Sequence, residues 1–192
     1  LKLFWQCKMI YTPAEDSYLL KSEVIKYAVG KKVLDIGSGS GIQAKAALLA
    51  GAKSVLAADI SEEAISNLSK DGIRAVKSDL FSNVKGNFSL IIFNPPYLPY
   101  EKKEDYESSL ATSGGEKGDE LIIRFIEAAG EHLARRGIIL IVLSSLTPKK
   151  RILECIRKHS MYYEVLSSKS LFMEELEVWK ISPINLKPDF SH

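Results

Sequence analysis

Three glycines at alternate positions constrain the fold of this chain more than any other feature of its sequence. Gly37, Gly39 and Gly41 stand between a strand-like run, residues 32–36, and an Ala- and Leu-rich helical run, residues 41–50. Glycine allows a tight turn and a close approach of the backbone to a ligand. The start of the helix adds backbone N–H groups that have no partner within the helix. This order of strand, glycine turn and helix predicts a parallel sheet with a binding site at the turn.

Strand-like and helix-like segments alternate along most of the chain, which is typical of an open parallel sheet with helices on both faces. We therefore predict an α/β fold with a doubly wound, mostly parallel sheet of seven strands. The last two strands are close enough in sequence to form an antiparallel pair. The predicted strands are residues 32–36, 54–59, 73–77, 88–93, 137–143, 162–167 and 175–181, and the predicted helices are residues 13–29, 41–50, a helix that starts after Ser61, 118–135 and 148–159.

In such sheets ligands bind beyond the carboxyl ends of the strands, and acidic residues stand at two of these ends. Asp59 ends the run 54–59, twenty residues after Gly39, where a carboxylate can accept hydrogen bonds from both hydroxyls of a ribose. Asp79 and Leu80 follow the third strand, where an adenine base is expected. Asp79 could accept a hydrogen bond from the adenine amine, or it could simply cap or turn the chain.

The glycine turn alone leaves two kinds of nucleotide ligand open. Gly39-x-Gly41-x-x-Ala44 also satisfies the dinucleotide pattern, with an acidic residue at the expected distance. Asp35, two residues before Gly37, argues against a dinucleotide because its carboxylate would repel a pyrophosphate. The same carboxylate could bind the cationic end of a nucleoside that carries an amino acid, which is therefore the favoured ligand.

The run 88–93 leads directly into Asn94-Pro95-Pro96-Tyr97. Two prolines fix φ and remove two N–H donors, so the loop is stiff and its carbonyl groups can accept hydrogen bonds. Asn94 adds a side-chain oxygen acceptor, and Tyr97 adds a flat aromatic surface. Two acceptors and a ring suit a planar –NH2 group, so we predict that this loop holds the nitrogen that reacts. The alternative is a rigid turn with an exposed aromatic side chain.

The composition of the chain excludes several functional classes. Of 192 residues, 46% are apolar and 26% charged, which is typical of a globular protein, and the net charge of +2 does not indicate a nucleic-acid binder. Two cysteines without a CxxC pair and three scattered histidines predict no metal site and a reducing compartment. The longest apolar run has six residues, and the first residues lack a signal-peptide pattern, so we expect a cytoplasmic protein without a membrane span.

Several of these stretches resemble one known family. Residues 35–41 resemble motif I of the class I S-adenosylmethionine methyltransferases, and residues 94–97 resemble the N/D-P-P-Y motif of members that modify amide or exocyclic amino nitrogens. Residues 11–20, Tyr-Thr-Pro-Ala-Glu-Asp-Ser-Tyr-Leu-Leu, are similar to a more specific segment of the HemK-like glutamine methyltransferases of the archaeal and eukaryotic branch. Residues 114–118 and 176–180 also resemble this branch, so the resemblance covers nearly the whole chain.

The resemblance implies a single Rossmann-like methyltransferase domain, with an N-terminal helical cover over residues 1–30, a catalytic core over residues 31–182 and a tail over residues 183–192. It implies S-adenosyl-L-methionine as the cofactor and no metal. The residues that it implies for cofactor binding are Ser17, Asp35, Gly37, Gly39, Gly41, Asp59, Asp79, Leu80 and Asn94, and those that it implies for holding the substrate amide are Asn94, Pro95, Pro96 and Tyr97.

The resemblance also implies a substrate and a partner. The substrate is the glutamine of the Gly-Gly-Gln motif in class I translation release factors, and the partner is a small zinc-binding activator subunit. The strand 73–77 is the expected sheet edge and a candidate contact for the activator, or an edge that Arg74 and Lys77 shield. The charged loop 98–117 is expected to help recognise the substrate. Basic residues at 149–151 and 157–158 favour a solvated helix face over a contact with RNA.

Four other functions remain open from the sequence. A nucleic-acid methyltransferase acting on an adenine amine shares the Asn-Pro-Pro-Tyr motif, although the net charge of +2 and the lack of an added basic domain disfavour it. A protein lysine methyltransferase is the second alternative. A non-catalytic protein that binds S-adenosylmethionine would not need Asn94 and Tyr97, and an NAD-dependent oxidoreductase would need a proton relay near the glycine turn.

Overall fold

The structure is a computed structural model that describes residues 13–96 and 117–186. Within these residues, seven strands form one sheet in the order β3-β2-β1-β4-β5-β7-β6. Neighbouring strands among β1 to β5 are parallel, whereas β7 is antiparallel to both β5 and β6. The strands are β1 Lys32–Ile36, β2 Ser54–Asp59, β3 Ala75–Lys77, β4 Phe88–Phe93, β5 Leu133–Ser144, β6 Met161–Leu171 and β7 Glu174–Pro183. The predicted fold class is confirmed, including the antiparallel pair at the end.

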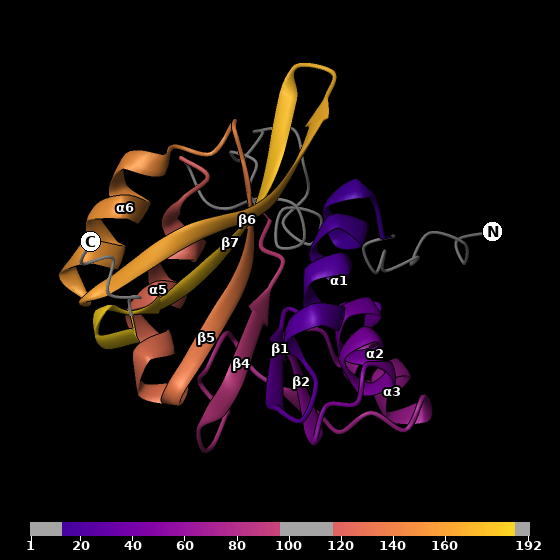
Figure 1. Ribbon diagram of the computed structural model, residues 1–192. Helices are drawn as coiled ribbons and strands as arrows, with labels where there is room; N and C mark the ends of the chain where they lie inside the picture. The colour runs from indigo at the N-terminus through magenta and orange to yellow at the C-terminus, as the bar shows by residue number, and fades with distance from the viewer. Residues whose placement is uncertain (1–12, 97–116, 187–192) are drawn as a thin grey trace.

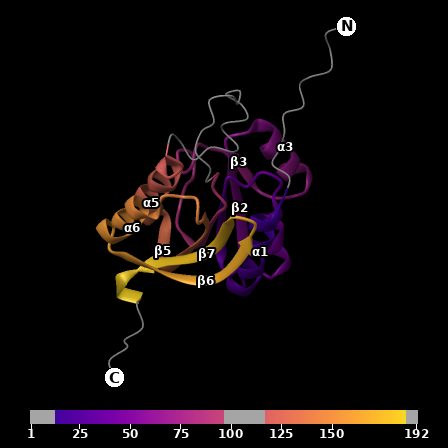
Figure 2. The ribbon, with the colours of Figure 1, turned by 90° about the horizontal axis from the view of Figure 1, so that it is seen from above.

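Helices cover both faces of this sheet (Figures 1 and 2). Buried side chains of α1, α2 and α3 belong to the apolar cluster on one face, and those of α5 and α6 belong to the cluster on the other. The helices are α1 Glu15–Tyr27, α2 Ile42–Leu49, α3 Glu62–Lys70, α5 Glu120–His132 and α6 Lys149–Lys158, followed near the end of the described chain by a 3-10 turn, η1 Ile184–Leu186.

Strand β5 shows how the sequence pattern produces this layered arrangement. Successive side chains of a strand point to opposite faces of the sheet. Ile139, Ile141 and Leu143 accordingly lie in one apolar cluster, and Leu140 and Val142 lie in the other. A strand that is buried on both faces needs an uninterrupted apolar run, which explains the six consecutive apolar residues near the middle of β5.

The carboxyl ends of the parallel strands bring the predicted site segments to one edge of the sheet. The glycine turn follows β1, Asp59 ends β2, Asp79 follows β3, and Asn94 follows β4. Helix α1, from the N-terminal part of the described chain, lies beside α2 in Figure 1, contacts β5, β6 and β7, and contributes to the same apolar cluster as α2. The fold therefore gathers residues that are up to about eighty positions apart in sequence.

The predicted boundaries are wrong in two places. The helix that was expected to continue to Arg135 ends at His132, and residues 133–135 already belong to β5. Arg136 has a positive φ of 66°, and the carbonyl oxygens of Ala134 and Phe88 approach Gly137 so closely that a Cβ there would lie 2.8 Å from each. The apolar spacing continues in helical phase, but the backbone is already extended at Leu133, with φ −78° and ψ 130°, so the helix ends before this turn.

The second difference concerns strand lengths. At the turn that joins them, β6 extends four residues beyond the predicted strand and β7 begins one residue earlier than predicted, so the two form a long hairpin. β3 has only three residues, where five were expected, but the sheet order places it at one edge as predicted.

Candidate functional site

The glycine turn after β1 has a backbone conformation that only glycine adopts easily. Gly37, Gly39 and Gly41 have φ angles of 62°, 51° and 77°. At Gly41 an added Cβ would also lie 2.6 Å from Cδ2 of Leu68, which is too close for a stable contact. The Gly41 N–H donates to the carbonyl of Ser38 at 2.7 Å, so the turn closes on itself at the start of α2.

Asp59 connects the glycine turn to the start of α3. Its side chain is 8% exposed, and its Oδ2 accepts a hydrogen bond from the Gly39 N–H at 2.8 Å. Its Oδ1 accepts from the Ser61 N–H, also at 2.8 Å. A carboxylate has about four lone-pair positions, so two further hydrogen bonds from a ribose remain possible.

Asp35 is a buried carboxyl group under the glycine turn. It is 1% exposed, and its Oδ2 accepts from the Ser38 hydroxyl at 2.5 Å and from the Ala44 N–H at 3.1 Å. Burial raises the pKa of Asp35 from 3.8 to about 7, although both hydrogen bonds lower it, and the nearby charge of Asp59 raises it further. A group of this kind is poised to ionise when a cation binds beside it.

Asn94 has one side-chain atom held in place by α1 and one that no described residue pairs with. Its Nδ2 donates to Oδ2 of Asp16 at 3.1 Å and to the hydroxyl of Ser17 at 3.3 Å, both on α1. Because a carboxylate only accepts hydrogen bonds, this contact orients the amide group of Asn94. The Oδ1 of Asn94 is buried, and no hydrogen-bond partner for it is found among the described residues. An unpaired buried acceptor is costly, so it indicates a donor supplied by a ligand.

The residues around Asn94 make a stiff support for it. Phe93 packs on Phe125 of α5, with ring centroids 4.5 Å apart. Pro95 is buried and Pro96 is half-buried. Tyr97, the last residue of the predicted motif, lies outside the described residues, as does the loop 98–116.

Two side chains that the sequence reasoning did not single out join these parts together. Asp16 holds Asn94, as described above, and Gln43 of α2 donates from Nε2 to the carbonyl of Ser17 at 2.9 Å. Gln43 is 3% exposed, and its Oε1 is a second buried acceptor for which the described residues offer no donor. A lone glutamine in an Ala- and Leu-rich helix that packs in the core is the signal that could have identified it.

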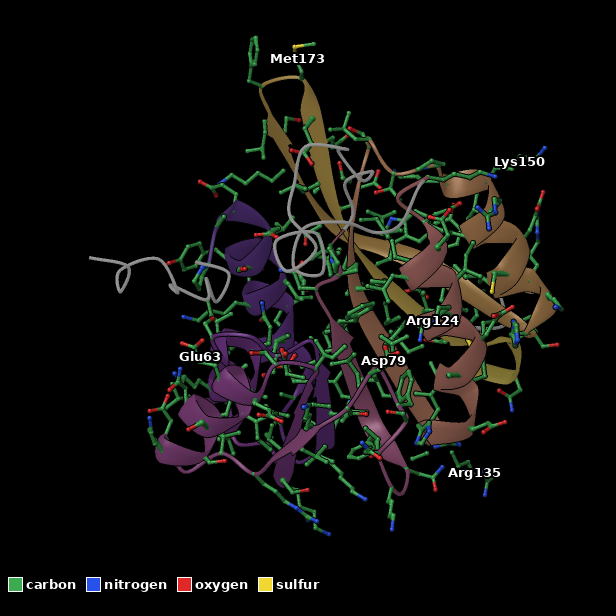
Figure 3. The ribbon with its side chains drawn as sticks, turned by 180° about the vertical axis from the view of Figure 1, so that it is seen from behind. Glu63, Asp79, Arg124, Arg135, Lys150 and Met173 are labelled. Atoms are coloured by element: carbon green, nitrogen blue, oxygen red, sulfur yellow. The ribbon has the colours of Figure 1, made fainter. Side chains whose placement is uncertain are left out.

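Asp79 and Leu80 lie farther along the same edge, opposite α5. Asp79 accepts a hydrogen bond from Arg124 at 2.8 Å, and Figure 3 shows these two side chains facing each other. Leu80 has a positive φ of 48°. Both partners of the ion pair are about half exposed. A hollow of about 540 Å³ adjoins them, lined by Asp79, Leu80, Phe81, Ser82, Arg124, Glu127, Ala128, Glu131 and His132.

These groups together suit a cationic nucleoside and a planar nitrogen. The turn offers backbone N–H groups, Asp35 can pair with a positive charge, and Asp59 can bind hydroxyls. Asn94 offers its free oxygen at the end of the neighbouring strand. No cluster of His, Cys, Asp or Glu that could hold a metal occurs in residues 13–96 and 117–186. In the same ranges, no helix is long and apolar enough to cross a membrane.

Residues 15–173 match the family profile described as the methyltransferase small domain. A putative protein N5-glutamine methyltransferase of Methanocaldococcus jannaschii is 36% identical, with 90% of this chain and 92% of the relative covered. The methyltransferase HEMK2 of Mus musculus is 27% identical, and the match covers 90% of this chain and 89% of HEMK2.

Among solved structures, the fold is similar to that of a chain in the E. cuniculi Mtq2-Trm112 complex. The TM-score is 0.73 at 23% identity, with 90% of this chain and 98% of that chain covered. The complex is described as responsible for the methylation of the eRF1 translation termination factor. At this identity the likeness shows a shared fold.

Proposed function

The chain belongs to the methyltransferase small-domain family, and from this premise we propose that it methylates the side-chain amide nitrogen of a glutamine in a protein. The substrate that fits best is the glutamine of the Gly-Gly-Gln motif in a class I translation release factor. Two relationships support this choice. The relative from M. jannaschii is named a protein N5-glutamine methyltransferase, and the similar fold from E. cuniculi belongs to a complex that methylates eRF1.

The observation that carries the proposal is the buried Oδ1 of Asn94, which has no hydrogen-bond partner within residues 13–96 and 117–186. A primary amide has two N–H donors, and Asn94 Oδ1 can accept from one of them. The carbonyl of Pro95, next in the chain, is the proposed acceptor for the other. Two acceptors fix the plane of the amide group, which presents the nitrogen lone pair in one direction.

The cofactor is S-adenosylmethionine, which supplies an electrophilic methyl group on a positively charged sulfur when it is bound. The residues of the site fit this molecule. Asp35 would face its amino-acid part, Gly37 and Gly39 would allow close approach of the backbone, and Asp59 would accept from the ribose hydroxyls. The remaining proposed contacts come from Ser17, Gly41, Asp79, Leu80 and Asn94.

The described side chains act mainly by holding the reactants. Asn94 and the stiff Pro95–Pro96 segment hold the substrate nitrogen in line with the methyl carbon, and Asp16 and Ser17 keep Asn94 in position. The bound cofactor would supply the methyl carbon to this nitrogen, and its sulfur would leave with the electron pair of the bond that breaks. The nitrogen then carries a positive charge, and its proton is lost to solvent. Positioning accounts for most of the acceleration in this scheme.

The test compares Asn94→Ala with wild type in transfer of a labelled methyl group to an intact class I release factor. We expect turnover to fall at least about 100-fold, while the cofactor dissociation constant changes little. Asn87→Ala is the matched control, because Asn87 is an exposed asparagine whose Nδ2 bonds to Glu131 and Leu133 at the other end of β4. Label on a factor whose Gly-Gly-Gln glutamine has been replaced, or on nucleic acid alone, would contradict the proposed substrate.

A partner subunit is a second part of the proposal. The outer side of β3 is an open sheet edge, where a further strand could pair. A zinc-binding activator is the proposed partner there, supported by the presence of Trm112 in the complex from E. cuniculi. Lys77 at this edge is paired with Glu62 at 2.6 Å, which neutralises one of the two basic side chains expected to shield it. A release factor as substrate implies the cytoplasm as the compartment.

The basic residues on α6 give little support for RNA as the substrate. Lys149 is paired with Glu177 at 2.7 Å, and Arg151 is paired with the buried Asp119 at 2.7 Å. Charges that are neutralised within the protein contribute less to binding of phosphates.

A further inference from the structure

The turn between β6 and β7 exposes two adjacent apolar side chains. Phe172 is 93% exposed and Met173 is 82% exposed. They are the only two residues between the paired Leu171 and Glu174, and Met173 has a positive φ of 61°. Two-residue hairpin turns favour Asn, Asp and Gly, which adopt positive φ at low cost. The local geometry therefore does not explain why Phe and Met stand here, and their exposure points to a contact with another molecule.

The register of the sheet places this tip on the same side as the candidate site. Phe93 of β4 lies level with Ile141 of β5, which pairs with Trp179 of β7. From Trp179, β7 extends five more residues to Glu174 beyond the carboxyl end of β4, a rise of about 17 Å. Asn94 also lies beyond Phe93, so the tip stands above the edge that bears the site. Figure 1 shows the hairpin projecting beyond the body of the sheet, and Figure 3 places Met173 at its end.

The hairpin is fixed to the same elements that position Asn94. Next to its tip the hairpin bonds to the end of β5, through Ser144 Oγ to Glu174 at 2.6 Å and through two hydrogen bonds between Ser145 and Glu175 at 2.8 and 2.9 Å. Lys169 of β6 pairs with Glu15 of α1. Glu15 is the neighbour of Asp16, the residue that holds Asn94. The tip is therefore held at a set distance from Asn94 by α1 and β5.

From these observations we infer that the Phe172–Met173 tip is a docking contact for the protein substrate, and that it binds an apolar surface of the folded protein that carries the target glutamine. This inference rests on the proposed function and adds a recognition surface to it. The charges around the tip favour a protein over a nucleic acid. Glu174 and Glu175 directly follow the tip, and a phosphate backbone would be repelled by both.

The sheet order also separates this contact from the proposed activator edge. β3 and β6 are the two outermost strands, so a subunit paired with β3 would lie at the opposite edge of the sheet. The tip stays available to the substrate when that edge is covered. A large aromatic side chain at the end of a braced hairpin is the kind of group that contributes most to protein–protein binding.

The experiment measures methyl transfer to an intact release factor by wild type, Phe172→Ser and the double variant Phe172→Ser/Met173→Ser. We expect KM for the factor to rise about 10-fold in the single variant and more in the double variant, with kcat at saturating factor and the cofactor dissociation constant unchanged. Phe172→Leu should restore part of the affinity. Leu49→Ser is the control, because Leu49 is 89% exposed at the end of α2 remote from the glycine turn.

The possible outcomes separate this inference from the proposed function. If wild type methylates the factor and the Phe172 variants have the same KM for the factor as wild type, only the docking contact is overturned. If kcat falls with unchanged KM, the tip acts on the catalytic site and the inference is also wrong. If wild type labels nucleic acid in place of the factor, the proposed function fails and the docking partner is wrong with it. Thermal unfolding of each variant, expected to match wild type because both side chains are exposed, shows that the fold is kept.

Discussion

At the scale of single residues, the site contains two kinds of position. At some the backbone conformation requires glycine, and at others burial changes the pKa of an ionisable side chain. Gly41 is an example of the first kind, since its φ is 77° and a side chain there would collide with Leu68. Asp35 is an example of the second kind, since its burial raises its pKa to about 7. The two kinds of residue respond differently to substitution.

Gly41→Ala should destabilise the protein by about 1–3 kcal/mol and weaken cofactor binding, because the new Cβ would displace either α2 or Leu68. Gly51→Ala is the matched control. Gly51 has a φ of 90°, but an added Cβ would meet no atom within 4 Å, so only the conformational cost of about 1 kcal/mol applies. Urea unfolding and a cofactor titration measure both effects. Equal cofactor binding by the two variants would show that contact with Leu68 is unimportant.

The ionisation of Asp35 should make stability depend on pH. Its folded pKa of about 7 exceeds the unfolded value of 3.8, so the folded state binds more protons between these values. The contribution of the protonated Asp35 carboxyl group to the free energy of unfolding is fully present below pH 3.8 and is lost as the pH rises through 7. For ligand-free protein this group should lower the free energy of unfolding by roughly 2–3 kcal/mol between pH 5 and pH 8. In Asp35→Asn this pH dependence should be absent, as urea unfolding at several pH values would show.

At the scale of elements, α1 is fixed to the rest of the site by polar contacts that cross between elements. Gln43 bonds to Ser17 across α1 and α2, and Asn94 bonds to Asp16 and Ser17 across β4 and α1. The apolar residues of α1 anchor the helix on the sheet, while these hydrogen bonds set its position at the site end. The helix therefore connects the glycine turn with the substrate loop.

Gln43→Ala should cost about 1–2 kcal/mol, because the buried carbonyl of Ser17 would lose its donor. We also expect weaker cofactor binding, since α1 is no longer joined to the start of α2. Ser22→Ala, on the exposed side of α1, should leave both properties unchanged. Thermal unfolding with and without cofactor separates the two effects. If the cofactor raised the unfolding temperature of the Gln43 variant as much as that of wild type, the proposed link would be refuted.

The turn into β5 offers a stabilising change. Arg136 has a φ of 66°, which is costly for a residue with a side chain. Arg136→Gly should therefore raise the free energy of unfolding by about 0.5–1 kcal/mol, after the greater flexibility of glycine in the unfolded chain is taken into account. Arg135→Gly next to it should give no such gain. Chemical unfolding measures the free energy of unfolding of both variants. A lower value for Arg136→Gly than for wild type would contradict the strain argument.

At the scale of the whole molecule, one sheet separates two apolar clusters, and every central strand contributes to both. Neither cluster can lose its strands without exposing the other, so we expect one cooperative unfolding transition, as in a single domain. Far-ultraviolet circular dichroism and tryptophan fluorescence should give the same midpoint in urea. Two separated midpoints would show that α1 or the β6–β7 hairpin unfolds independently of the sheet.

The sequence by itself determined the order of the elements, because local patterns encode them. The glycine turn marks the first strand–helix unit, the apolar run of β5 requires burial on both faces, and Ser61 caps α3 by accepting from the Ala64 N–H at 3.3 Å. The motif residues at the ends of β1, β2 and β4 were predicted for the same reason. The end of α5 was predicted wrongly, because the helical spacing of apolar residues continues past His132 while the backbone becomes extended at Leu133.

Only the tertiary structure decided what the polar side chains face. The sequence places Asp16 and Asn94 seventy-eight positions apart, and no local pattern says that one holds the other and leaves Oδ1 unpaired. The same is true of Gln43 and of the ion pair between Asp79 and Arg124. The position of the Phe172–Met173 tip follows from the register of β7 on β5. Such contacts depend on how strands align, and alignment is set by packing of the whole sheet rather than by neighbours in the chain.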